Sequence, residues 1–78
     1  MIKNNVEFDS IVCVVRDEVA EVYSAPLCFA NEEAGKRWFR NLADTSKKDY
    51  TLYKIADYCS KSSDIRLVDR VILIRGTD

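Results

Sequence analysis

The longest apolar runs of the chain are no longer than β-strands. Ile11–Val15 and Val71–Ile74 consist mainly of β-branched residues, as is typical of strands. A membrane-spanning helix needs roughly 20 consecutive apolar residues, so we expect no membrane segment. The N-terminus has one lysine and no apolar core, so it is unlike a signal peptide. We therefore expect a cytoplasmic protein built largely from short strands.

The size of the chain limits how large a core it can form. Its 78 residues predict a single domain, 1–78, with residues 1–7 frayed. A domain of this size buries only about 60% of the surface that its unfolded chain exposes. The core should therefore be thin, and a homo-oligomer, most simply a homodimer, is expected. A hydrophobic content of 47% with 32% charged residues indicates a globular rather than a disordered protein.

The order of strand-like and helix-like segments predicts an α+β fold of the order ββαββ, with one helix packed on an antiparallel sheet. Asn31 is a good N-cap, and two glutamates follow it where the helix dipole favours acidic residues. The C-terminal part is read either as two short strands or as one strand with a bulge at Asp69–Arg70. The expected segments are strands Phe8–Arg16 and Val19–Ser24, a short link Leu27–Phe29, a helix from Glu32 to about Ala43 or Asp44, a strand Tyr50–Cys59, and Ile65–Val68 with Val71–Ile74.

The expected helix carries an apolar arc. On a wheel of about 100° per residue, Trp38 lies between Ala34 and Leu42. We therefore expect Trp38, Phe39 and Leu42 to be the contribution of the helix to the core. The indole N–H of Trp38 would then need a partner or a place at the edge of the core.

Basic residues occupy the other arc of the helix and the loop after it. Glu32 and Glu33 stand four residues before two of them, a spacing that favours ion pairs of about 0.2–0.5 kcal/mol each. The arc is therefore either an ordinary solvated face or a surface that binds phosphate groups. These basic residues are Lys36, Arg37 and Arg40 in the helix and Lys47 and Lys48 in the loop.

The strand Tyr50–Cys59 supplies two further candidates for nucleic-acid binding, Tyr53 and Lys54. By alternation, Lys54 and Ala56 share one face, while Tyr53 and Asp57 share the other. Tyr53 could stack on a base, which is worth roughly 1–3 kcal/mol per base. The alternative is that the tyrosines only cover the sheet.

Charge is unevenly distributed along the chain. The whole sequence has a net charge of −1, but residues 1–35 carry −5 and residues 36–61 carry +4. Such asymmetry indicates a polar interaction surface without naming its partner.

Enzymatic chemistry has little support in the residues. The chain has no histidine, so a serine or cysteine nucleophile lacks its usual base. Gly35 and Gly76 are the only glycines and lie far apart, so they form no phosphate-binding loop. Cys13, Cys28 and Cys59 have neither a disulfide nor a metal-site spacing, and buried free thiols are expected. We predict a non-enzyme with no catalytic residue, no metal site and no cofactor.

The four consecutive apolar residues Val71, Ile72, Leu73 and Ile74 indicate a strand that is covered on both faces. In so small a protein, the second cover could come from another subunit, which makes these residues a candidate oligomer interface. Alternatively, the helix covers one face and an aromatic residue of the same chain covers the other.

A pattern of spaced residues runs through residues 12–75. It comprises Val15-Arg16-Asp17, Tyr23, Pro26, Asn31, Arg37, Phe39, Asp49-Tyr50, Leu52-Tyr53, Ile55 and Tyr58. The pattern resembles the small non-structural protein of gokushovirus-type microviruses, which are phages with single-stranded circular DNA. The resemblance implies a DNA-binding protein that acts in genome synthesis or packaging in the cytoplasm of a bacterial host. The chain departs from the family at Ala56, where glycine is usual, at Ser62–Ser63, where a Thr-Gly turn is usual, and at Asp69–Arg70, where a proline often occurs.

Two hypotheses follow. In the first, the protein is a phage accessory protein that binds single-stranded DNA non-specifically. In the second, it is an oligomeric module that binds a viral or host protein without nucleic acid.

Overall fold

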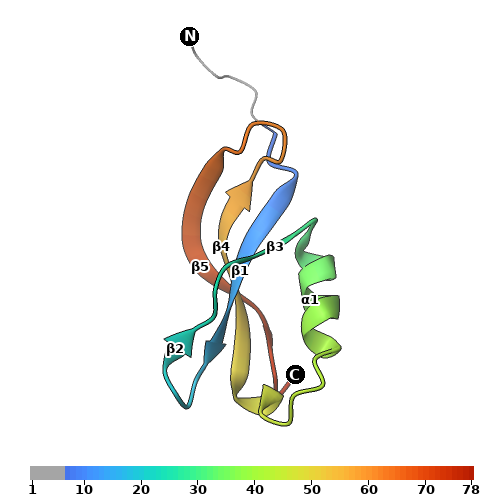
Figure 1. The fold of residues 1–78 in the computed structure, drawn as a ribbon, viewed down its shortest axis with the longest axis vertical. Coiled ribbons are helices and arrows are strands. Elements are labelled where there is room, and N and C mark those ends of the chain that lie inside the picture. Colours follow the sequence, from blue (N-terminus) through green and yellow to red (C-terminus); the bar gives the residue numbers. More distant parts are fainter. Residues whose placement is uncertain (1–6) are drawn as a thin grey trace.

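The computed structural model describes residues 7–78 (Figure 1). It contains one α-helix against a five-stranded antiparallel sheet, which confirms the α+β class. The expected fraying of residues 1–7 lies almost wholly outside the described residues. The elements are β1 (Ser10–Asp17), β2 (Val22–Tyr23), β3 (Leu27–Phe29), α1 (Glu32–Arg40), the short 3-10 helix η1 (Lys47–Asp49), β4 (Tyr50–Tyr58) and β5 (Ile65–Arg75).

The sheet is organised around β1 and β4. The strand order is β2-β1-β4-β5, and β3 also pairs with β1, beyond the end of β2. The predicted order ββαββ is therefore matched only in outline. The segment Leu27–Phe29, expected to be a link, forms a strand, and the C-terminal part is one long strand.

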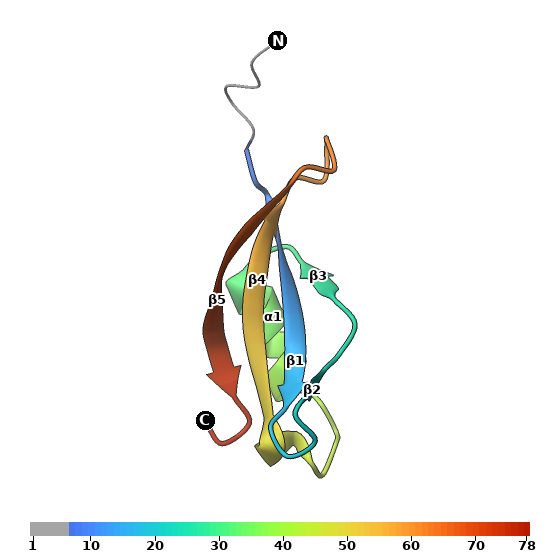
Figure 2. The same cartoon turned by 90° about the vertical axis from the view of Figure 1, so that its left-hand side faces the viewer.

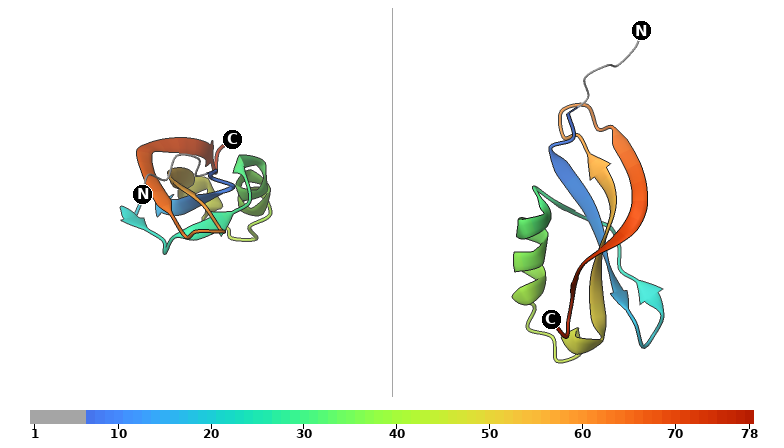
Figure 3. Two further views of the ribbon diagram at one scale, coloured as in Figure 1. Left: turned by 90° about the horizontal axis from the view of Figure 1, so that it is seen from above. Right: turned by 180° about the vertical axis from the view of Figure 1, so that it is seen from behind.

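α1 covers one face of the sheet and leaves the other without a helix. Seen along the long axis, α1 lies to one side of the strands (Figure 3). Figure 2 looks onto the opposite face, which we call the open face. Cross-strand neighbours share a face, so the ladders assign residues to it. The open face includes Val12, Val14, Arg16, Thr51, Tyr53 and Ala56, together with Tyr23 and Ile72.

The core lies between α1 and the sheet. Phe39 reaches it from the helix, and a cluster of buried side chains surrounds it. Gly35 lets α1 approach closely, since a Cβ there would lie 3.2 Å from the Phe29 ring. The buried cluster consists of Ile11, Cys13, Phe39, Leu52 and Ile74.

The predicted burial of Trp38 is wrong. Its side chain is 36% exposed, and its ring rests on Phe29 with centroids 5.4 Å apart. The buried stripe of the helix passes through Gly35 and Phe39 and continues to the partly buried Leu42. On the helical wheel this stripe lies to one side of the expected arc, so Trp38 stands at the edge of the stripe and not in its centre.

Element boundaries also differ from expectation. Asn31 caps α1 as predicted, its side chain accepting from Ala34 N at 2.8 Å, but the helix ends at Arg40. The expected strand Val19–Ser24 is reduced to β2, because a turn precedes it. In this turn Asp17 Oδ1 accepts from the backbone N–H of Val19 and of Ala20, each at 3.0 Å.

A bulge in β4 overturns the predicted alternation after Lys54. Cys13 pairs with Lys54 and Val12 with Ala56, so Ile55 has no partner in β1. Beyond the bulge the faces exchange. Ala56 lies on the open face, whereas Asp57 joins Lys54 on the helix side.

β5 corresponds to the predicted alternative of a single interrupted strand. Its pairing with β4 is irregular between Leu67 and Val71, which brackets the predicted bulge at Asp69–Arg70. The candidate oligomer interface is divided by the fold. Ile74 is buried and Leu73 packs against the core, while Val71 and Ile72 are 50% and 40% exposed.

The cysteines are free, as predicted, but they are not all buried. Cys13 and Cys59 are buried, whereas Cys28 is exposed on β3.

Candidate nucleic-acid interface

Lys54 lies apart from the other predicted binding residues. Its ammonium group is 2.9 Å from Asp57 Oδ1 and 3.9 Å from Glu32 Oε2, and its side chain is only 18% exposed. The pairing follows from the bulge, which turns Asp57 towards Lys54. Two carboxylates already neutralise Lys54, so it is a poor phosphate ligand.

The helical arc of Lys36, Arg37 and Arg40 is less paired than expected. Glu32 pairs with Lys54 across to β4, and residues 7–78 contain no ion pair between Glu32 and Lys36 or between Glu33 and Arg37. Arg37 and Arg40 are exposed, and so is Lys48 in η1. The arc therefore keeps its positive charge at the surface.

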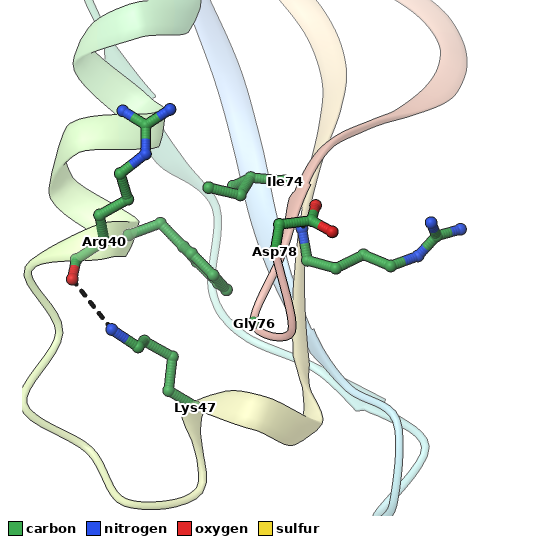
Figure 4. Close-up of a pocket in the computed structure, with 7 residues that line it drawn as sticks. Arg40, Lys47, Ile74, Gly76 and Asp78 are labelled. Atoms are coloured by element: carbon green, nitrogen blue, oxygen red, sulfur yellow. Dashed lines mark hydrogen bonds between the residues drawn. The ribbon is translucent and has the colours of Figure 1, made fainter.

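Arg40 and Lys47 meet at a small cleft of about 240 Å³, which Figure 4 shows. The ammonium group of Lys47 donates to the backbone carbonyl of Arg40 at 2.9 Å. Arg75 at the end of β5 is the third basic residue that lines this cleft, with Asp78 as its only acid. We call Arg40, Lys47 and Arg75 the basic cleft.

The tail after β5 closes the floor of the basic cleft. Gly76 N donates to Tyr50 O at 2.8 Å, and Arg75 N donates to Asp78 Oδ2 at 2.8 Å. A Cβ on Gly76 would stand 1.7 Å from the carbonyl oxygen of Lys47. Only glycine fits this close approach of two backbone segments.

A row of polar side chains crosses the open face from β5 to β2. Arg75 is opposite Thr51, Thr51 is opposite Arg16, and Arg16 is opposite Tyr23. Residues that face one another across antiparallel strands point to the same side, so the row lies on one surface. The Arg75 side chain lies in this row, so Arg75 lines the basic cleft only at its edge.

Arginine and tyrosine side chains are layered at the β2 side of the open face. The rings of Tyr23 and Tyr53 have centroids 6.2 Å apart and are tilted by 60°. The guanidinium of Arg70 reaches across β4 and lies 5.3 Å from the Tyr23 centroid and 5.4 Å from that of Tyr53. Arg16 lies 5.2 Å from the Tyr23 centroid. We call Arg16, Tyr23, Tyr53 and Arg70 the aromatic–arginine face.

One carboxylate holds the polar ends of this face in place. Glu18 accepts from Arg16 Nε at 2.7 Å and from the Tyr53 hydroxyl at 3.4 Å. A hydrogen bond from Thr51 lowers the pKa of Glu18 most strongly, burial raises it, and the hydrogen bond and charge of Arg16 lower it further. Glu18 therefore offsets Arg16, whereas Arg70 has no acidic partner within residues 7–78.

The chain matches a known protein family. The model of the Phage ORF5 protein family matches residues 10–78. The chain belongs to this family of phage proteins. No curated protein and no solved structure matches it.

The fold of this phage protein separates the predicted binding residues and brings other candidates next to one of them. Arg40 and Lys47 lie together, while Tyr53 is on the open face. The sequence did not predict a binding role for Arg16, Tyr23 or Arg70. The alternation of β1 and β2 could have placed Arg16 beside Tyr23, but Arg70 lies in an irregular segment whose direction no periodicity reveals.

The described part of the phage protein lacks two other features. Neither of its helices has the length and apolar character that crossing a membrane requires. Within residues 7–78, no three acidic or cysteine side chains gather in a way that could hold a metal ion.

Proposed function

We propose that this phage protein is a non-enzymatic accessory protein that binds single-stranded DNA without sequence preference. It would act during genome synthesis or packaging in the cytoplasm of a bacterial host, as the resemblance to the microvirus non-structural protein implies. The observation that carries the proposal is the aromatic–arginine face. Its two tyrosine rings and two guanidinium groups lie on a surface that no element of the described chain covers.

The chemistry of this face suits unpaired bases. Tyrosine rings accept base stacking from any base, because every base has a π-face. Arg70 is already held against the rings of Tyr23 and Tyr53, so a base can stack on a preorganised cationic layer. In a duplex the same base faces are hidden by their neighbours, which favours the single strand.

The phosphate groups would follow a basic path from this face to the basic cleft. Arg75 joins the two regions, since it lies in the row with Arg16 and lines the cleft with Lys47. Four phosphate contacts, from Arg70, Arg75, Arg40 and Lys47, predict a slope of log affinity against log salt of about −2.8 for a single strand. The predicted contributions of Lys36, Arg37 and Lys48 would extend this path along the helix and η1.

The test is a salt titration of binding to fluorescently labelled oligothymidylate, followed by anisotropy. Tyr53→Leu should weaken binding by about 5- to 150-fold at fixed salt, which corresponds to roughly 1–3 kcal/mol for one stacked base. Arg70→Gln should make the salt slope less steep by about 0.7. Tyr58→Leu is the matched control, because Tyr58 lies on the same strand outside the aromatic–arginine face. Failure to bind at low salt, or equal losses for Tyr53→Leu and Tyr58→Leu, would refute the proposal.

The second hypothesis, an oligomeric interaction module, is favoured by one observation. β5 is an 11-residue strand at the end of the sheet, and it carries the exposed apolar residues Leu67, Val71 and Ile72. An edge of this kind pairs readily with another strand. We propose that β5 pairs with β5 of a second copy, to give a homodimer.

Light scattering at several concentrations tests this pairing. Val71→Lys places a charge on the exposed edge and should shift the protein to the monomer, while Val19→Lys in the exposed turn before β2 should not. A monomer at all concentrations, or an unchanged dimer in Val71→Lys, would contradict it.

A further inference from the structure

An apolar groove lies beside Trp38, away from the basic cleft. It has a volume of about 460 Å³ and lies between α1, β1, the chain around β2 and the start of β4. It shares only Tyr23 with the aromatic–arginine face. The residues that line it are Val15, Asp17, Val22, Tyr23, Ser24, Ala25, Leu27, Trp38, Leu42, Asp44 and Tyr50.

Trp38 and Val22 make the wall of the groove apolar and accessible. Trp38 is 36% exposed, and Phe29 supports its ring from the sheet side. Val22 is exposed on the facing β2. Large apolar side chains left open around a concave site are typical of a binding surface.

The charged residues that line the groove are all acidic. Asp17 and Asp44 line it, and its lining contains no lysine or arginine. Both carboxylates lie close to Tyr50. Tyr50 is opposite Asp17 in the ladder, and its hydroxyl donates to Asp44 Oδ2 at 3.0 Å. The hydrogen bond to Asp44, then burial, and then the charges of Asp44, Asp17 and Asp49 raise the pKa of Tyr50.

We propose that this groove binds a segment of a partner protein that presents an apolar side chain next to a lysine or arginine. The apolar side chain would lie against Trp38 and Leu42, and the cation would face Asp17 and Asp44. Charge complementarity decides between the classes of occupant. A phosphate backbone would be repelled by the two carboxylates, whereas the basic cleft, where Arg40 and Lys47 meet beside one acid, suits it. The groove is therefore a site for protein rather than for nucleic acid, and it adds a second partner to the proposed DNA-binding function.

The single tryptophan of the chain reports on the groove directly. The probes are two tryptophan-free peptides, acetyl-Lys-Leu-Phe-Lys-amide and its glutamate analogue acetyl-Glu-Leu-Phe-Glu-amide. The lysine peptide should shift the emission of Trp38 to shorter wavelength in a saturable manner. The glutamate peptide should bind at least tenfold more weakly, and added salt should reduce this difference.

The double variant Asp17→Asn with Asp44→Asn removes both charges from the rim. Asparagine keeps an oxygen at Oδ1, the atom that accepts the turn hydrogen bonds of Asp17 and the bond from Ser46 N to Asp44. The fold should therefore survive, which circular dichroism checks. This variant should lose the preference for the lysine peptide, while Glu33→Gln, on the exposed surface of α1, should keep it.

Equal binding of the two peptides, or no response of Trp38 to either, would overturn the proposal. So would a shift of Trp38 emission caused by oligothymidylate alone, which would assign the groove to a nucleobase. Oligothymidylate that binds while Trp38 stays unchanged would leave the DNA-binding function intact, so the two proposals fail separately.

Discussion

The two faces of the sheet are covered by different kinds of side chain. Under α1, Phe39 and Leu52 are almost fully buried in an apolar cluster. On the open face, Val14 and Thr51 are also buried, yet the outer layer consists of arginine and tyrosine side chains. A chain with one nine-residue helix can cover only one face with apolar residues. The comparison teaches that long amphipathic side chains can cover the other face and still offer a polar surface to a partner.

The largest difference between the faces should be in stability. Phe39→Ala removes a ring that is 1% exposed and should lower the free energy of unfolding by about 3–5 kcal/mol. Tyr53→Leu, on the open face, should cost less than about 1.5 kcal/mol, because its ring is only half-buried and the replacement keeps an apolar side chain there. Urea unfolding followed by circular dichroism measures both. Similar losses for the two variants would show that the open face is as much a structural core as the helix side.

The tail at the basic cleft provides the next test. In Gly76→Ala the new Cβ would meet the Lys47 carbonyl oxygen, so either the tail or η1 must move. We expect a loss of about 1–3 kcal/mol, as for other overpacked sites. Thr77→Ala, at the exposed neighbouring position, is the control. If the tail moves, Arg75 moves with it, and the affinity for oligothymidylate should fall in Gly76→Ala but not in Thr77→Ala.

The sequence predicted the class of the fold because its signals are local. Each of these signals specifies one element over a few residues. They are the β-branched run at Ile11–Val15, the N-cap Asn31 and the aromatic strand Tyr50–Cys59. The errors arise where two segments must be brought together. β3 exists because Leu27–Phe29 pairs with β1, and the bulge at Ile55 exists because β4 must fit β1. Neither pairing leaves a periodic trace in the sequence.

The candidate binding residues illustrate the same limit. Charge asymmetry pointed to residues 36–61, and Arg40 and Lys47 do lie together in that part of the chain. It could not reveal that Lys54 pairs with Asp57, since the strand alternation placed them on opposite faces. The position of Arg70 could not be predicted for a related reason. Its guanidinium lies over two tyrosine rings because the pairing in the middle of β5 is irregular.

Ion pairs on the helix side should give a smaller, pH-dependent effect. Hydrogen bonds from Lys54 and Arg66 lower the pKa of Asp57 below its usual value of 3.8. The stabilisation is therefore present above that value and is lost as the pH falls through the lower pKa of the folded state. Because these pairs are partly solvated, we expect a contribution below about 1 kcal/mol.

Urea unfolding of the wild type and of Asp57→Asn measures this effect. The pH is varied from about 2 to about 6, a range that spans the titration of a carboxyl group. The two proteins should converge in stability at the acidic end and differ near pH 6. Asp69→Asn, an exposed carboxylate on β5, is the control and should follow the wild type. A constant difference at every pH would mean that Asp57 acts through packing rather than through charge.

The reactivity of the cysteines towards a thiol reagent tests the difference between the two faces of the sheet. Cys13 lies under α1, and burial raises its pKa to about 11, so at pH 8 it should be both neutral and inaccessible. Cys28 is exposed and should react rapidly with a thiol reagent such as dithionitrobenzoate. Cys59 is buried, although a hydrogen bond from Ser62 lowers its pKa, so it should react later than Cys28. Cys28→Ser should abolish the fast phase, and Cys13→Ser should leave it unchanged. If Cys13 reacts as fast as Cys28, α1 opens readily from the sheet, and the helix side is not the closed face that the structure shows.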